Sequence, residues 1–262
     1  ETGLAEATDD KGARVAQRGF TGNSINGNIE GPEVIYNTTF EKYYLFIAYD
    51  WLETKYNVRV ARGDAPDGPF YDFAGRDVNL EEDHGPMILA PYRFKNHGGW
   101  QGTSHVSVFD DDGQFYMAHQ GRPGVDRFFM VMHVRKVFWT EDGWPIVSPQ
   151  RYAAIEQTEI TLGELAGEWE YIFLDYRVVP GYAQEQVSPD FQDAAVVKVN
   201  IDGTINNDDG TWTYNAPWLE LRWGSGQTDR VIVQRGRDWE NKKESLIFSG
   251  LSDEGIAIWG KK

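Results

Sequence analysis

The sequence predicts a nearly all-β protein in which blade-like, four-stranded sheets precede a small β-barrel or β-sandwich. Aromatic residues and glycine are abundant, with 10 Trp, 13 Tyr, 14 Phe and 28 Gly among 262 residues, as expected of short strands joined by tight turns. Apolar and polar residues alternate in short runs, and helix signals are scarce. The length suits two compact units better than one.

The first predicted unit has strands that alternate in hydrophobicity and are separated by turn residues. Its strands are expected at residues 33–37, 42–50 and 56–62. The turn chemistry after each strand includes a segment rich in Asp, Pro and Gly at residues 64–68. We expect this four-stranded unit to be complete by about Phe73.

A second unit repeats this plan, which suggests propeller blades. Its strands are expected at residues 87–94, 105–110, 114–120 and 128–139, with a hairpin turn at residues 110–113. Two blades cannot close a ring, because a propeller usually needs four to eight blades that cover one another's faces. The missing blades must therefore come from elsewhere.

The pattern changes near residue 153, where we expect a domain boundary. Residues 156–164 are polar and unperiodic, and further strand-like runs follow, separated by Gly- and Asp-containing turns. We therefore assign residues 1–152 to the propeller part. Residues 153–262 are expected to form a small β-barrel or sandwich.

Composition excludes several classes of partner. The net charge of −16 argues against nucleic acid or an anionic membrane, because phosphate contacts need clustered Lys and Arg. No apolar run approaches the roughly 20 residues of a membrane-spanning helix. Cysteine is absent, so the chain has neither disulfides nor thiolate metal sites. A neutral partner such as a sugar polymer is permitted.

Glu30 is the candidate catalytic residue, at the point where a Gly- and Asn-rich segment leads into the first strand. A carboxyl group there would face the propeller axis at the start of an innermost strand. Flanking Ile29 and Pro32 would limit its hydration, which favours the protonated form that a general acid needs. A solvated loop carboxylate is the alternative, and the local sequence alone favours it.

Several segments in consistent order resemble the family 43 glycoside hydrolases, specifically the endo-1,5-α-L-arabinanases with a C-terminal β-domain. The matching segments are residues 28–32, 43–50, 56–62, 103–108, 143–153 and 238–262. The first of them carries the Ile-Glu-Gly-Pro context of the family's general acid. The resemblance covers nearly the whole chain, and it corresponds to the C-terminal portion of those enzymes.

This resemblance implies a five-bladed propeller of which the chain supplies the last two blades and a strand of the preceding one. It also implies inverting, endo-acting hydrolysis of α-1,5-L-arabinan by a secreted or periplasmic enzyme, with acid and base roughly 6.5 to 9.5 Å apart. Of the family's catalytic carboxylates only Glu30 has a match here. An N-terminal fragment of the same enzyme, as a second chain or as the rest of a precursor, would supply the others.

His105 is the candidate metal ligand. It opens a predicted strand after Gly102-Thr103-Ser104, and by itself such a histidine is more often a core or hydrogen-bonding residue. The resemblance implies that His105 is the one side chain that binds a central calcium ion, whose other ligands are mostly waters. Calcium is the expected cofactor.

Four residues are candidates for substrate binding: Asn28, Trp51, Trp100 and Arg122. The tryptophans could stack on furanose rings, although packing within a blade is the commoner role of such residues. Trp100 is expected on a loop, because glycines flank it on both sides. Arg122 resembles the arginine of a family His-x-Arg segment, but one extra residue separates it from His119.

Two other functions stay open. A non-catalytic protein could hold polysaccharide with the same surfaces. An exo-acting arabinofuranosidase or xylosidase of the same clan would share the acid residue and differ in releasing only monomer.

Overall fold

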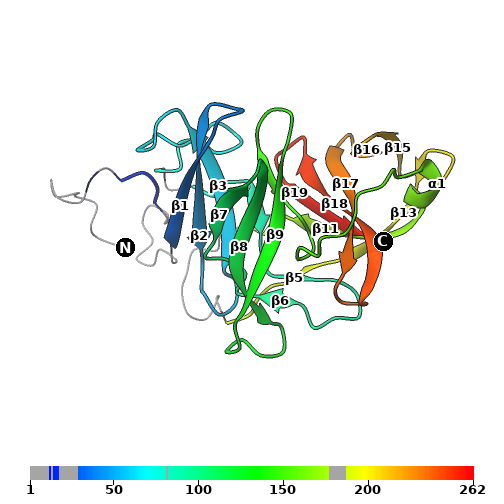
Figure 1. Ribbon diagram of the computed structural model, residues 1–262, viewed down its shortest axis with the longest axis horizontal. Coiled ribbons are helices and arrows are strands. Elements are labelled where there is room, and N and C mark those ends of the chain that lie inside the picture. Colours follow the sequence, from blue (N-terminus) through cyan, green and yellow to red (C-terminus); the bar gives the residue numbers. More distant parts are fainter. Residues whose placement is uncertain (1–11, 13, 18–28, 81, 177–186) are drawn as a thin grey trace.

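The computed structural model describes residues 12, 14–17, 29–80, 82–176 and 187–262 of the chain. These residues form two sheets, antiparallel except for one pair of strands, and a closed β-barrel (Figure 1). Within them α1 (Leu162–Leu165) is the only helix, and no helix in the described part is long or apolar enough to cross a membrane. The predicted all-β class is confirmed.

The first sheet has four strands in sequential order, β1 (Ile29–Asn37), β2 (Lys42–Tyr49), β3 (Asn57–Gly63) and β4 (Met87–Leu89). The expectation that this sheet is complete by Phe73 is wrong. Tyr71 forms only isolated bridges to Arg62 and Asp77, and β4 supplies the fourth strand by pairing with β3. Alternation within residues 87–94 could not reveal which sheet offers a free edge to this segment.

The second sheet is built on β7 (Ser107–Asp111), β8 (Gln114–Pro123), β9 (Val131–Trp139) and β10 (Pro145–Val147). Beyond β8 it continues through β6 (Trp100–Gln101), β5 (Tyr92–Arg93) and β12 (Gln192–Asp193). The β5–β12 pair is parallel. The short strand β12 lies just before barrel strand β13 in the sequence, but it belongs to a sheet whose other strands come from residues 92–147. Residues 87–94 therefore contribute to both sheets.

The C-terminal strands close into a barrel, and the predicted choice between barrel and sandwich is resolved in favour of the barrel. Its strands are β11 (Gly167–Leu174), β13 (Ala195–Val199), β14 (Thr204–Ile205), β15 (Gly210–Asn215), β16 (Trp218–Trp223), β17 (Thr228–Asp238), β18 (Lys243–Ser252) and β19 (Ala257–Lys261). Closure occurs because β19 pairs with both β11 and β18. Closure leaves no unpaired edge strand.

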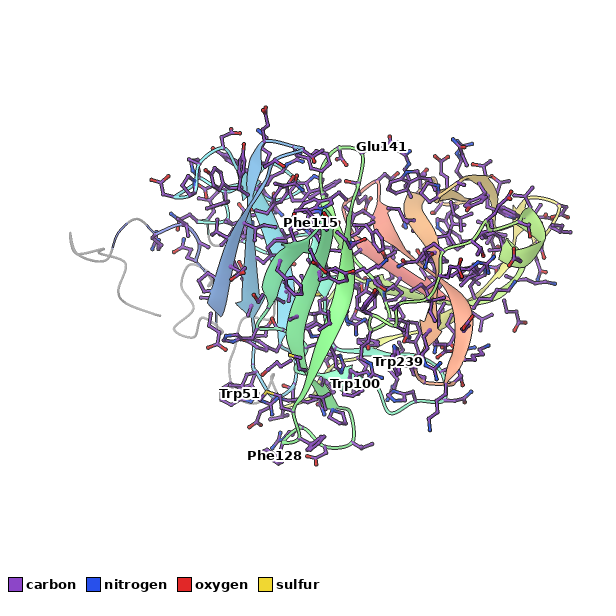
Figure 2. The ribbon with its side chains drawn as sticks, in the orientation of Figure 1. Trp51, Trp100, Phe115, Phe128, Glu141 and Trp239 are labelled. Carbon is purple, nitrogen blue, oxygen red and sulfur yellow. The ribbon has the colours of Figure 1, made fainter. Side chains whose placement is uncertain are left out.

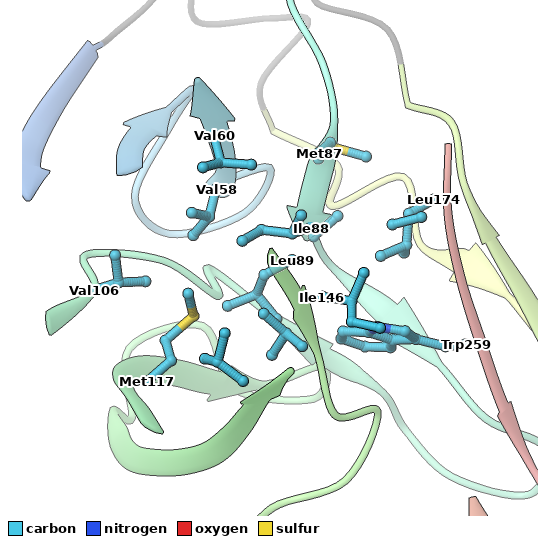
Figure 3. Close-up of a cluster of buried hydrophobic side chains, with 14 of the residues drawn as sticks. Val58, Val60, Met87, Ile88, Leu89, Val106, Met117, Ile146, Leu174 and Trp259 are labelled. Atoms are coloured by element: carbon cyan, nitrogen blue, oxygen red, sulfur yellow. The ribbon is translucent and has the colours of Figure 1, made fainter. Parts of the chain in front are cut away.

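The two sheets and the outer wall of the barrel share one apolar core (Figure 3). Leu89 and Ile146 from the sheets lie in the same cluster as Leu174 and Trp259 from the barrel, and all four are at most 2% exposed. Successive strand residues point to opposite faces, so Trp169 enters the barrel interior while Leu174 faces the sheets. Each such buried side chain stabilises the fold by about 1.5–3 kcal/mol.

Candidate active site

Glu30, Tyr56 and His105 form the candidate active site. The Tyr56 hydroxyl donates a hydrogen bond to Glu30 Oε1 over 2.5 Å, and it lies 3.2 Å from His105 Nδ1. Tyr56 is fully buried, whereas Glu30 and His105 are exposed in this chain. A buried hydroxyl thus links two solvent-facing groups, one at the start of β1 and the other in the loop before β7.

A β-bulge at the start of β1 sets the direction of Glu30. Glu30 pairs with Ala48 and Glu33 pairs with Phe46, so three steps along β1 oppose two along β2. Gly31 within this bulge has a φ of 55°, and a Cβ there would lie 3.4 Å from His105 Nδ1. Any larger side chain would meet the imidazole, which explains glycine after the glutamate.

Two loops hold Tyr56 and His105 together through backbone acceptors. The amide of Gly102 donates to the carbonyl of Thr54 over 2.7 Å, and the Ser104 hydroxyl donates to the carbonyl of Asn57 over 2.9 Å. A Cβ on Gly102 would lie 2.5 Å from the carbonyl oxygen of Leu52, so only glycine permits this approach. The loop before β7 is therefore fixed against the loop before β3.

The electrostatics keep Tyr56 protonated. Burial raises the pKa of the Tyr56 hydroxyl well above its ordinary value. The hydrogen bond to Glu30 and the negative charge of Glu30 raise this pKa further. Tyrosine has one proton to donate. While that proton points to Glu30, the contact with His105 requires Nδ1–H of the imidazole as donor. A neutral His105 then carries its free lone pair on Nε2.

The described residues do not by themselves form a calcium site. Calcium prefers six to eight oxygen ligands, and this cluster offers one imidazole nitrogen. No group of three or more His, Asp or Glu side chains in the described part of the chain could hold a metal ion. Calcium at His105 stays a prediction that needs water or ligands beyond these residues.

The expected shielding of Glu30 is not found in this chain. Glu30 and Pro32 are exposed, and Ile29 is only half-buried. The physical reason is that β1 is the outermost strand of its sheet, with β2 on one side. On the other side Glu33 Oε1 is 3.4 Å from both the hydroxyl of Ser107 and the amide of Val108.

The predicted substrate-binding residues are only partly brought together. Trp51 is half-buried in the loop that precedes Tyr56, and Figure 2 shows it toward the end of the sheets where β6 lies. Arg122 donates from Nη1 to the carbonyl of Arg127 over 2.7 Å, and its Cδ packs beside Gly102. Sugar contacts of both residues stay predictions. Asn28 lies outside the described residues.

Trp100 differs from the expectation of a loop position. It lies in β6 and is 8% exposed, with its ring edge-to-face against His133 at 4.4 Å. The guanidinium of Arg151 lies 5.3 Å from the ring centre. These contacts give Trp100 a packing role, because flanking glycines allow close approach of strands as readily as they form loops.

Tyr56 is the member of the candidate site that sequence reasoning missed. In the sequence, Tyr56 was identified only as the first residue of the strand expected at residues 56–62. In the structure Asn57 pairs with Tyr49 and Tyr49 with Ile29, so Tyr56 reaches the end of the sheet that carries Glu30. This register depends on pairing across three strands, and no signal within the segment encodes it.

Comparison with known proteins identifies the family of this chain. Residues 4–145, more than half of the chain, match the model of glycosyl hydrolases family 43. Residues 149–260 match a C-terminal lipocalin-like domain associated with that family.

The chain is 27% identical to an extracellular endo-α-(1→5)-L-arabinanase of Bacillus subtilis, covering 99% of this chain and 59% of that protein. It is 24% identical to an extracellular endo-α-(1→5)-L-arabinanase of Thermotoga petrophila, covering 93% of this chain and 55% of that protein. The chain therefore spans little more than half the length of these relatives.

Among solved structures, a family 43 glycoside hydrolase from Bacillus licheniformis superimposes with a TM-score of 0.77 at 27% identity, covering 90% of this chain and 56% of that one. The endo-1,5-α-L-arabinanase of Thermotoga petrophila has the same fold, with a TM-score of 0.77 at 23% identity over 90% of this chain and 56% of that one. The chain belongs to family 43 of the glycosyl hydrolases.

Proposed function

We propose that this protein is part of an endo-acting arabinanase and that Glu30 is its general acid. The observation that carries the proposal is the hydrogen bond from buried Tyr56 to Glu30 at the bulged start of β1, within the segment that matches family 43. The names of the Bacillus and Thermotoga relatives support α-1,5-linked arabinan as the substrate.

In the proposed reaction Glu30 donates the proton of its carboxyl group to the glycosidic oxygen as the C–O bond breaks. A water molecule attacks the anomeric carbon from the opposite face, and a second carboxylate takes the proton of that water. Tyr56 stabilises the Glu30 carboxylate that remains by donating its hydrogen bond, and Glu30 regains a proton from solvent for the next cycle. The general base would come from chain beyond the described residues.

Several further expectations belong to the same proposal. The two sheets would be blades of a five-bladed propeller, completed by an N-terminal segment in the same or a separate polypeptide. Residues 1–152 would form the catalytic part, and residues 153–262 an accessory barrel. Calcium would take His105 and water as ligands and would supply a fixed positive charge beside the acid. The extracellular relatives favour a secreted enzyme.

The test replaces Glu30 by glutamine in the complete enzyme. Glu30→Gln should abolish release of reducing sugar from linear arabinan while binding persists, because the amide cannot donate a carboxyl proton. Glu33→Gln is the matched control, since Glu33 lies on the same strand and near the same neighbouring sheet. Undiminished hydrolysis by Glu30→Gln would refute the assignment.

Product analysis separates the proposed activity from the two alternatives. Oligosaccharides of mixed length indicate attack within the chain, as proposed. Arabinose or xylose as the sole product indicates an exo-acting enzyme of the same clan. Tight binding of polysaccharide without any cleavage by the complete protein indicates a binding protein.

A further inference from the structure

The two ends of the C-terminal barrel differ in how they are closed. At one end α1 covers the opening: Leu165 is fully buried in the barrel core, and its carbonyl accepts a hydrogen bond from Trp169 Nε1 over 2.8 Å. Below α1 the interior is filled, with the rings of Trp169 and Phe248 4.8 Å apart. Eight-stranded barrels are just wide enough for such side chains.

Among the described residues the opposite end opens to solvent as a shallow hollow of about 640 Å³, which we call the barrel mouth. It lies where β11 ends, at the turn between β14 and β15, and at the turn between β16 and β17. Its lining combines aromatic rings with oxygen-bearing side chains, from Tyr171, Phe173, Asp208, Asp209, Trp223 and Gln227. Barrel mouths are frequent ligand sites, and this volume suits a small molecule.

A buried carboxylate holds the lining in place. Asp229 is 0% exposed and accepts hydrogen bonds from the Tyr171 hydroxyl at 2.7 Å, Trp223 Nε1 at 2.5 Å and Gln227 Nε2 at 2.6 Å. Tyr171 and Trp223 are thereby fixed in an edge-to-face pair with their centroids 5.7 Å apart. The half-buried Trp223 ring and the Gln227 side chain are positioned before any ligand arrives.

The chemistry of this lining selects among ligand classes. The exposed carboxylates of Asp208 and Asp209 are hydrogen-bond acceptors, so they favour hydroxyl donors and repel anions. Apolar side chains, including Trp169 and Phe248, occupy the barrel interior, so we expect the ligand at the mouth. The described residues hold no group of three carboxylates or histidines for a metal ion. An aromatic ring beside oxygen acceptors is complementary to a sugar, which has an apolar C–H face and hydroxyl edges.

We propose that the barrel mouth is a saccharide-binding site, separate from the cluster around Glu30, that takes a short stretch of neutral polysaccharide with one sugar ring against Trp223. The choice of arabinan as the sugar rests on the proposed function. The site would hold a substrate chain on the enzyme between cleavage events.

The test is isothermal titration calorimetry of the full 262-residue chain with a linear α-1,5-arabino-oligosaccharide, in a Glu30→Gln background. Trp223→Ala should weaken binding at least tenfold. Trp218→Ala is the matched control and should change affinity less than twofold, because Trp218 is also a half-buried tryptophan of β16 but does not line the mouth.

A second measurement guards against misfolding of Trp223→Ala. The ¹⁵N indole resonance of Trp223, assigned by its loss in Trp223→Phe, should shift during titration of the otherwise unaltered chain. Asp208→Asn, in an exposed turn, should weaken binding about threefold without affecting folding.

Each outcome separates this inference from the proposed function. Binding that leaves the Trp223 resonance unmoved, or that survives Trp223→Ala in a folded chain, overturns the barrel-mouth site. This conclusion does not depend on the result of the Glu30→Gln activity test. Binding of xylo-oligosaccharides at Trp223, with arabino-oligosaccharides ignored, supports a saccharide site and counts against arabinan as the substrate. Absence of binding by every neutral oligosaccharide overturns the inference, even if the complete enzyme cleaves arabinan.

Discussion

The Tyr56 hydroxyl donates a hydrogen bond to Glu30 Oε1 over 2.5 Å, and the oxygen of this hydroxyl lies 3.2 Å from His105 Nδ1. The direction of these bonds depends on the charge of Glu30. When Glu30 is ionised, Tyr56 donates to it and accepts from His105. When Glu30 carries a proton, it can donate to Tyr56, which can then donate to His105. The tyrosine thus couples the acid to the histidine tautomer.

Tyr56→Phe should lower kcat of the complete enzyme about tenfold or more and leave KM nearly unchanged. The reason is that a hydrogen bond to a charged group contributes about 1.5–3 kcal/mol, and this one would form as Glu30 becomes a carboxylate. Steady-state kinetics on linear arabinan provide the measurement. Tyr44→Phe is the control, because its hydroxyl donates to the carbonyl of Gly143 in the same part of the fold. Equal losses in both variants would contradict a role for Tyr56 in catalysis.

Lys261→Met should lower the free energy of unfolding by about 3–5 kcal/mol, because it leaves buried carboxylates without their cation. Lys261 Nζ is fully buried, 2.8 Å from Asp238 and 2.9 Å from Glu240. Burial alone would raise the pKa of Asp238, but hydrogen bonds from Asn241 and Lys261 outweigh it and lower that pKa to about 2. Urea unfolding measures the change.

The control for this variant is Lys243→Met on the exposed side of β18, which should change stability by no more than about 0.5 kcal/mol. If both lysine variants are equally stable, the buried ion cluster does not contribute as described.

His133→Phe should make folding less sensitive to acid. Burial, followed by the charges of His119 and Arg135, holds the pKa of His133 far below its ordinary value, and neither ring nitrogen has a partner among the described residues. A histidine with a depressed folded pKa stabilises the fold fully above the unfolded pKa of about 6.5, and this stability is lost as pH falls below it.

At pH 5, which is 1.5 pH units below the unfolded pKa, His133 lowers the free energy of unfolding by about 2 kcal/mol, at about 1.36 kcal/mol for each unit. The stability difference between His133→Phe and the original chain should therefore shift by that amount in favour of the variant between pH 7.5 and pH 5. Urea unfolding at the two pH values is the measurement. Parallel pH curves for the two proteins would show that His133 does not titrate on unfolding.

Calcium binding to the complete enzyme should depend on His105. Calorimetric titration of the metal-free enzyme should show one calcium site that His105→Ala weakens at least tenfold, because the other expected ligands are waters. His97→Ala is the control, since the ring of His97 stacks on Trp100 and His97 is not part of the Glu30, Tyr56 and His105 cluster. Unchanged calcium affinity in His105→Ala would show that His105 does not bind the ion.

Local hydrophobicity, bounded by turn residues, was sufficient to predict several strands nearly to the residue. Residues 42–50 were expected as a strand, and β2 spans Lys42–Tyr49. Prediction failed where a segment's partner decides its place, as for β4 and for Trp100. A short apolar run such as Met87–Leu89 fits either neighbouring sheet, and only the free edge of β3 selects one of them.

The sequence by itself determined the all-β class, the family and the acidic residue at the start of β1, since these follow from composition, periodicity and local motifs. Tertiary structure alone decided that Tyr56 contacts Glu30, 26 positions away, and His105, 49 positions away. It also decided that Asp229 gathers Tyr171 and Trp223 at an open barrel end. These contacts depend on strand register, a bulge and barrel closure, which are set by pairing between distant segments.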